Sequence, residues 1–335
     1  MHDFEHVPAR DRDEVLRELS GGAVAIAGGT ELLNWVRLGI AGPDRLVDLA
    51  GLAAGDRIER TADGLTIGAG ATLNQVGEHD LVRTHATALA QACLAAASAQ
   101  VRNRATLGGN VLQKTRCGYF RSEEPLPWGC NKRRPGSGCA ARHGLNERHA
   151  VLGWTDDCVA TQPSDPAVAL ACLDARVEVL GPAGPRTLPM TGFHLTQQEA
   201  AAAGGDPAGT ETVLRADELI VAYHLPVRPA ERSTYLKVRE RASYEYALVS
   251  AAAATVLDGG RLAGVRLALG SVAQKPWRLS RAEAALRGGP LTEQAARRAV
   301  ALDLADARPL EHNGYKLRMA ATAAVRALMA TGEQA

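Results

Sequence analysis

Apolar and polar positions near the start of the chain follow helical and strand-like spacings in turn. Residues 10–20 place apolar side chains at helical intervals and end before a glycine pair, which predicts a helix. The apolar run 23–27 predicts a short strand, and a helix over 30–38 is expected to begin with a capping threonine. Residues 45–49 predict a second strand. This order indicates a small α/β unit over about residues 1–60.

The pattern changes in the next part of the chain. Residues 64–70 predict a strand, and the alanine-rich segment 81–99 predicts a helix. Strands are expected to resume over 168–180, and the apolar run 218–226 predicts another strand. Strands and helices follow one another without a βαβ order, so a mixed α+β unit is expected over about 61–226.

The last part of the chain begins after a proline-containing linker at 226–231. Its apolar runs predict a three-stranded antiparallel meander followed by helices. The expected strands are 233–238, 247–257 and 262–269, and the expected helices are near 280–287, 292–304 and 315–329. The predicted fold class is therefore α+β, with a two-part domain over 1–226 and a further α+β domain over 231–335.

Composition excludes several classes of protein. Apolar residues make up 46% of the 335 residues, so a packed interior is expected. The formal net charge is +1 with no basic face, which argues against nucleic-acid binding. No apolar run approaches the roughly 20 residues that span a bilayer, so no membrane insertion is expected. The chain shows no charged and apolar leader, so no export signal of its own is predicted.

Two glycine turns are candidates for binding an anionic group. The first, at 27–30, follows a predicted strand and precedes a helix, where backbone amides and the helix dipole favour a phosphate. The second lies at 106–110. Neither matches the dinucleotide fingerprint or the P-loop, and each alone is typical of an ordinary tight turn. Together they fit the pyrophosphate of a dinucleotide, which needs amides from more than one segment.

The six cysteines fall into two groups. Cys93 and Cys172 lie in alanine-rich segments and are expected to be buried core residues. The other four lie among glycine, proline and arginine with the spacing C-x12-C-x8-C-x18-C, which contains no C-x-x-C pair. They are Cys117, Cys130, Cys139 and Cys158. The spacing leaves three hypotheses open: a [4Fe–4S] cluster, a structural zinc ion, or two disulfides.

The other charged and polar residues of this segment do not predict a specific function. Lys132, Arg133 and Arg134 are expected to form a basic, solvated part of the loop, although positive charge there would favour thiolates. His143 and His149 match no helical metal pair and are expected at the surface. The sequence shows no nucleophile motif and no carboxylate pair, so any catalysis is expected to depend on a cofactor.

Three motifs resemble those of a known family. The segments 27–32, 106–110 and 163–165 resemble the FAD-contacting motifs of the medium subunit of molybdenum hydroxylases, the xanthine dehydrogenase family. The resemblance extends over the whole chain and includes 237–244 and 275–278. It implies a two-part FAD-binding domain of the PCMH type followed by a C-terminal flavoprotein domain. It also implies an oxidoreductase subunit that is active only with partner subunits.

Within that family, the cysteine loop over about 112–158 resembles the extra loop of the FAD subunits of bacterial periplasmic aldehyde oxidoreductases. There the cysteines hold a [4Fe–4S] cluster, so the resemblance implies that the four loop cysteines are its ligands here. It also implies a large molybdenum-cofactor subunit and a small [2Fe–2S] subunit as partners. Electrons from the [2Fe–2S] clusters would pass through FAD to an external acceptor.

The resemblance also implies a set of flavin contacts. Thr30, Gly108 and Gly109 are expected near the pyrophosphate, and Asp165 at the ribityl or ring end of the flavin. The full expected set is Ile26, Ala27, Gly28, Gly29, Thr30, Glu31, Leu32, Leu33, Asn34, Thr106, Gly108, Gly109, Asn110, Ser164 and Asp165. The compartment is expected to be the periplasm, reached by export with a partner subunit, or the cytoplasm. A stand-alone flavoenzyme and a zinc-stabilised scaffold are the alternatives.

Overall fold

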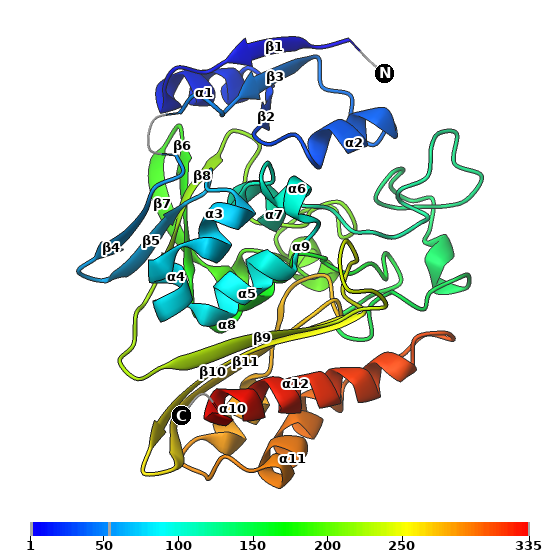
Figure 1. The fold of residues 1–335 in the computed structure, drawn as a ribbon. Helices are drawn as coiled ribbons and strands as arrows, with labels where there is room; N and C mark the ends of the chain where they lie inside the picture. Colours follow the sequence, from blue (N-terminus) through cyan, green and yellow to red (C-terminus); the bar gives the residue numbers. More distant parts are fainter. Residues whose placement is uncertain (1–2, 53–54, 334–335) are drawn as a thin grey trace.

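A computed structural model describes residues 3–52 and 55–333. Three sheets follow one another from the N-terminal to the C-terminal end of the molecule, and the segment with the four loop cysteines extends from one side (Figure 1). The fold is mixed α+β, as predicted. No helix in the described ranges is long and apolar enough to cross a membrane.

The first sheet forms the expected small α/β unit. Its elements are β1 (Glu5–Pro8), α1 (Arg12–Ser20), β2 (Val24–Ile26), α2 (Leu32–Arg37) and β3 (Arg45–Asp48). The three strands are parallel in the order β1-β3-β2. The predicted capping role of Thr30 is wrong, because α2 begins one residue later, after Glu31, and has no side-chain cap.

The second sheet is antiparallel, with the order β4-β5-β8-β6-β7. Its strands are β4 (Ile58–Thr61), β5 (Gly64–Gly68), β6 (Arg176–Gly181), β7 (Gly184–Pro189) and β8 (Leu219–Leu225). Its helices are α3 (Leu73–Glu78), α4 (Asp80–His85), α5 (Thr87–Ala95), α6 (Ala99–Arg102), α7 (Leu107–Val111), α8 (Asp165–Cys172) and α9 (Gln197–Ala202), with 3-10 turns η1 (Ala140–Arg142) and η2 (Met190–Gly192).

Two predictions in this part are wrong. The segment 81–99 is not one helix, because the backbone leaves the helical region at Ala86 and Ala97 has a φ of +46°. Strands were expected over 168–180, and β6 confirms this for 177–180, but the first part of that range belongs to helix α8, which is capped by Ser164 and has proline in its first turn. Every residue of α8 is buried, and a short apolar run without a polar face cannot distinguish a buried helix from a buried strand.

The third sheet is antiparallel and has four strands, one more than predicted, in the order β12-β11-β10-β9. Its elements are β9 (Arg232–Val238), β10 (Val249–Asp258), β11 (Arg261–Gly270), β12 (Trp277–Arg278), α10 (Ser280–Leu286), α11 (Glu293–Leu304) and α12 (Tyr315–Glu333). The missed strand β12 has only two residues, too few for an alternating pattern.

Both faces of this third sheet are buried. Alternate residues of β10 point to opposite sides: Ala252 and Ala254 belong to the core around α5 and α8, whereas Ala251 and Ala253 belong to the core beneath α12. This explains why β10 is continuously apolar rather than alternating. The sheet therefore joins the C-terminal helices to the middle of the molecule (Figure 1).

Candidate functional site

The first glycine turn joins β2 to α2 and is packed against Arg104 and Ala105, which directly precede the second turn. A Cβ built on Gly28 would lie 1.8 Å from the carbonyl oxygen of Arg104, so no other residue fits without moving the backbone. Gly29 has a φ of +72°, in the left-handed region that favours glycine. Among the described residues, the amides of Gly28, Gly29 and Thr30 donate to no protein acceptor. These amides are available to an anionic ligand.

The second glycine turn has a different role. Its residues begin helix α7, and Thr106 caps that helix by accepting from the amide of Gly109 at 3.2 Å. The amide of Gly108 donates to the carbonyl of Ala69 at 2.9 Å, and the amide of Asn110 donates to the carbonyl of Thr106 at 2.8 Å. These amides are already satisfied within the protein. The first turn therefore offers unpaired amides, whereas the amides of the second are occupied.

The third motif connects the middle and C-terminal parts of the molecule. The hydroxyl of Ser164 donates to Oδ1 of Asn110 at 2.7 Å, which joins this motif to the second turn. Asp165 is buried, and it accepts from the Tyr235 hydroxyl at 2.5 Å and from Nζ of Lys237 at 2.7 Å. Burial and the neighbouring carboxylate raise the pKa of Tyr235 well above its usual value. Both oxygens of Asp165 therefore accept from side chains of β9.

A large pocket lies beside all three motifs. Its lining includes Trp35, Val111 and Gln162, which follow or closely precede residues of the first, second and third motif respectively. The space measures about 1130 Å³ with its open mouth included. Sequence reasoning missed these lining residues and also Leu214 and Glu211, because they share no motif and converge only through the fold. None of the fifteen expected flavin contacts, which all lie in the described ranges, lines this pocket itself; Trp35, Val111 and Gln162 are their neighbours in the sequence.

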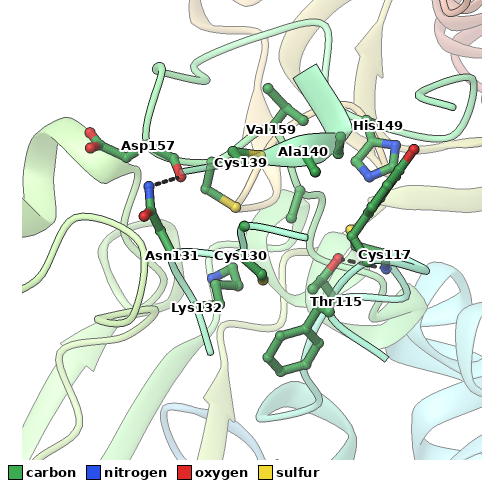
Figure 2. A pocket seen from close by; sticks show the side chains of 16 residues that line it. Thr115, Cys117, Cys130, Asn131, Lys132, Cys139, Ala140, His149, Asp157 and Val159 are labelled. Atoms are coloured by element: carbon green, nitrogen blue, oxygen red, sulfur yellow. Dashed lines mark hydrogen bonds between the residues drawn. The ribbon is translucent and has the colours of Figure 1, made fainter. Parts of the chain in front are cut away.

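All four loop cysteines line one smaller pocket (Figure 2). Cys117, Cys130 and Cys139 approach it from separate parts of the loop, and Cys158 returns to it at the loop's end. All four are free thiols, so the structure does not contain the two disulfides that the spacing left open. Cys93 and Cys172 lie fully buried in α5 and α8, as predicted.

The four thiols differ in their surroundings. Burial raises the pKa of Cys117 to about 12. A hydrogen bond with Cys158 lowers the pKa of Cys139 to about 7 and raises that of Cys158. Within residues 3–52 and 55–333, no three His, Cys, Asp or Glu side chains converge on a position for a single metal ion.

Basic side chains anchor the loop and are not solvated, contrary to the prediction for Lys132 and Arg133. The Lys132 side chain is 3% exposed and donates to Oε1 of Glu211 at 2.8 Å, while Lys114 donates to Oε2 at 2.8 Å. Burial opposes ionisation of Glu211, but the two ammonium groups outweigh it and lower its pKa to about 2. Arg133 and the more exposed Arg134 donate to carbonyls of the loop and its surroundings. Lys132 lines both pockets.

Glu31 ties the first glycine turn to the loop. Its carboxylate accepts from Nε1 of Trp35 at 2.8 Å, from the amide of Lys114 at 3.2 Å and from Nη2 of Arg116 at 2.8 Å. Arg121 also donates to it. The amide of Arg121 donates in turn to the carbonyl of Cys117 at 3.0 Å. The carboxylate of Glu31 is therefore directed at the loop, and the expected contact of this residue with a flavin stays a prediction.

His149 is also placed differently from the prediction. It was expected at the surface, but it is 7% exposed and lines the cysteine pocket (Figure 2). Burial, together with the nearby ammonium of Lys316, lowers its pKa to about 4. His143 is exposed, as expected.

Comparisons with known proteins define the class. Residues 4–228 match a family model described as the FAD binding domain in molybdopterin dehydrogenase, and residues 234–331 match the CO dehydrogenase flavoprotein C-terminal domain. Together these define a two-part FAD-binding flavoprotein. The chain belongs to the FAD-binding medium subunits of the molybdenum hydroxylases, which are oxidoreductases.

Individual relatives agree with this family. The chain is 44% identical over 302 residues to the aldehyde oxidoreductase FAD-binding subunit PaoB of Escherichia coli (strain K12), covering 89% of this chain and 88% of that one. It is 27% identical to the putative xanthine dehydrogenase FAD-binding subunit XdhB of the same organism, covering 81% and 74%. A structure of carbon monoxide dehydrogenase from Hydrogenophaga pseudoflava is similar with a TM-score of 0.75 and 25% identity, covering 99% and 98%.

Proposed function

We propose that this chain is the electron-transferring FAD subunit of an aldehyde-oxidising molybdenum hydroxylase. Its partners would be a large molybdenum-cofactor subunit and a small subunit with [2Fe–2S] clusters. The similarity to the aldehyde oxidoreductase subunit of E. coli is the observation that supports this proposal, because it extends over most of both chains. Bound FAD would supply the redox chemistry that takes electrons from the [2Fe–2S] clusters and delivers them to an external acceptor.

The residues around the first glycine turn fit FAD. The unpaired amides of Gly28, Gly29 and Thr30 would bind the pyrophosphate, and the large pocket that Trp35 lines would accept another part of the cofactor. Trp35, an aromatic residue of that pocket, extends the set of expected contacts. The amides of Gly108, Gly109 and Asn110 are bonded within the protein, so the first turn would supply the amides of the site.

The cysteine pocket fits a [4Fe–4S] cluster held by Cys117, Cys130, Cys139 and Cys158. Four free thiols surround one small space, and each would bind a different iron at a corner of the cluster. Burial raises the pKa of Cys130, and the hydrogen bond with Cys139 together with burial raises that of Cys158, while the ammonium of Lys132 acts in the opposite direction on both. A single zinc ion, the alternative, would need the donors to converge on one point.

The flavin site is tested by Gly28→Ala. The added methyl would meet the backbone of Arg104, so the first turn must move and bound FAD should fall to a small fraction of the wild-type content. Flavin absorbance per folded chain measures it. The matched control is Gly42→Ala in the same unit, where a Cβ meets no atom within 4 Å. Full FAD in a folded Gly28→Ala protein would exclude this site.

The metal and the partnership are tested on anaerobically purified protein. Iron and acid-labile sulfide are expected in equal amounts, four of each per chain, and zinc in their place would support the scaffold alternative. The isolated chain should not oxidise aldehydes, and adding the two partner subunits should produce turnover. Robust aldehyde oxidation by the chain alone would instead identify a stand-alone flavoenzyme.

A further inference from the structure

His149 is the residue of the cysteine pocket whose bonding is incomplete. Both ring nitrogens, Nδ1 and Nε2, are buried without a hydrogen-bond partner, and among the pocket's lining residues no other side chain has such atoms in the part of the chain that the structure describes. Buried polar groups in native proteins are satisfied in the great majority of cases. The missing partner of this imidazole is therefore expected in the pocket that it lines.

The backbone of His149 is fixed from the C-terminal domain. Its carbonyl accepts from Nζ of Lys316, on α12, at 2.8 Å and from Nδ2 of Asn313 at 3.2 Å. Its amide donates to the carbonyl of Asn146 at 3.1 Å. With donor and acceptor of the backbone both engaged, the ring is held at the pocket wall near Cys117 and Ala140 (Figure 2).

The number of ligands in the pocket indicates whether the His149 ring binds iron or donates a hydrogen bond. Four thiolates supply one ligand to each of the four irons, so the cluster needs no fifth ligand from the protein. An imidazole always has at least one N–H to donate. The sulfur atoms of an iron–sulfur cluster accept hydrogen bonds, and such bonds raise its reduction potential because the reduced cluster is more negative.

We propose that His149 donates an N–H hydrogen bond to a sulfur of the cluster held by the four cysteines. It is a positioning residue that favours the reduced cluster, not a ligand. This inference rests on the proposed cluster. The C-terminal domain thereby influences the redox state of the cysteine loop, since α12 holds the residue that makes the bond.

The test compares His149→Phe and His149→Gln with the wild type, using the full chain purified anaerobically with any subunits that accompany it. His143→Phe is the matched control, an exposed histidine of the same loop. Iron and sulfide per chain are measured first. The cluster is then titrated with dithionite and followed by low-temperature EPR, in which [4Fe–4S] signals relax faster than [2Fe–2S] signals.

With full iron, His149→Phe should lower the ratio of reduced to oxidised cluster by up to about tenfold at the wild-type midpoint, as expected for one lost hydrogen bond. His149→Gln, which keeps an N–H donor, should restore part of the shift, and His143→Phe should show none. Full iron with an unchanged midpoint in His149→Phe overturns the inference alone. Iron loss in both His149 variants overturns it in favour of a ligand role. A wild-type chain without iron and sulfide overturns the proposed cluster as well.

Discussion

The cysteine loop and the C-terminal sheet are stabilised in opposite ways. Residues 249–256 of β10 are almost entirely buried, and the sheet lies between two extensive apolar cores. Between residues 112 and 158 the loop has one short 3-10 turn and a small apolar cluster around Phe120 and Leu126, and near its end Val151 and Leu152 enter the C-terminal core. It is held instead by buried charges and, in our proposal, by a cluster. A region without a core can be ordered when each polar group has a partner.

The anchors of the loop lie at the edge of the proposed flavin pocket. Glu31 follows the first glycine turn and binds Arg116 and Arg121 of the loop. Glu211 lines the large pocket and binds Lys132 of the loop. The order of the loop and the shape of the flavin site are therefore coupled through two carboxylates, whereas the C-terminal sheet is coupled to them mainly through apolar packing and Asp165.

Among the substitutions that test the difference between the cysteine loop and the C-terminal sheet, Cys139→Ser is expected to have the largest effect. Losing one of four cluster ligands should remove most of the iron and release the loop, because little apolar surface remains to hold it. Hydrogen exchange of residues 117–158 should become fast while exchange in β9–β11 stays slow. Cys93→Ser, in the core of α5, is the control and should retain full iron. Protection of the loop that persists without iron would show that polar contacts alone are sufficient.

Leu267→Ala tests the other side of the comparison. Leu267 is fully buried in β11 within the C-terminal core, so the cavity should lower the free energy of unfolding by about 2–5 kcal/mol. Chemical denaturation measures this loss. Iron per folded chain should stay at the wild-type level, because the loop enters this core through Val151 and Leu152 and none of the four cysteines belongs to it. A proportional loss of iron from folded protein would mean that the two regions form one cooperative unit.

The sequence predicted the sheet far better than the loop, for physical reasons. Strands such as β10 are specified locally by their own apolar residues, so residues 247–257 were assigned correctly as a strand. The two-residue β12 exists only because β11 offers it hydrogen bonds, and no local pattern records that. Helix α8 was missed because burial on all sides removes the polar face by which helices are detected.

Within the candidate site, the sequence predicted which residues carry reactive side chains but not which residues those side chains contact. The four cysteines were identified from their setting, and they do line one pocket. The burial of His149 and Lys132 depends on α12 and on Glu211, which are distant in the sequence. Asp165 likewise finds its partners in β9, about 70 residues later. Such long-range pairs leave no signature in a single sequence.

Glu31→Gln should have a moderate effect that sharpens the coupling between loop and flavin site. The change keeps the shape of the side chain but removes the charge that binds Arg116 and Arg121, and hydrogen bonds to charged groups contribute about 1.5–3 kcal/mol. The affinity for FAD should fall because α2 is held less firmly, while iron content stays high. Flavin release on dilution measures the affinity. Glu14→Gln, in an exposed pair with Arg10, is the control. Unchanged flavin affinity would restrict Glu31 to a role within the loop.

Lys316→Met is tested by its effect on the pH dependence of stability, which is smaller than the effects above. Lys316 joins the two regions, since its ammonium donates to the carbonyls of His149 and Ser271 at 2.8 and 2.6 Å. Burial and the charge of Arg148 lower its pKa from 10.5 to about 7. Between these values the unfolded chain binds more protons than the folded one, so the free energy of unfolding should rise as the pH rises from about 7 towards 10.5. Lys316→Met should flatten this rise, and Lys275→Met should not. The test is the change in the denaturation midpoint between pH 7.5 and pH 9.5. An equal change in wild type and Lys316→Met would show that the buried ammonium stays charged throughout this range.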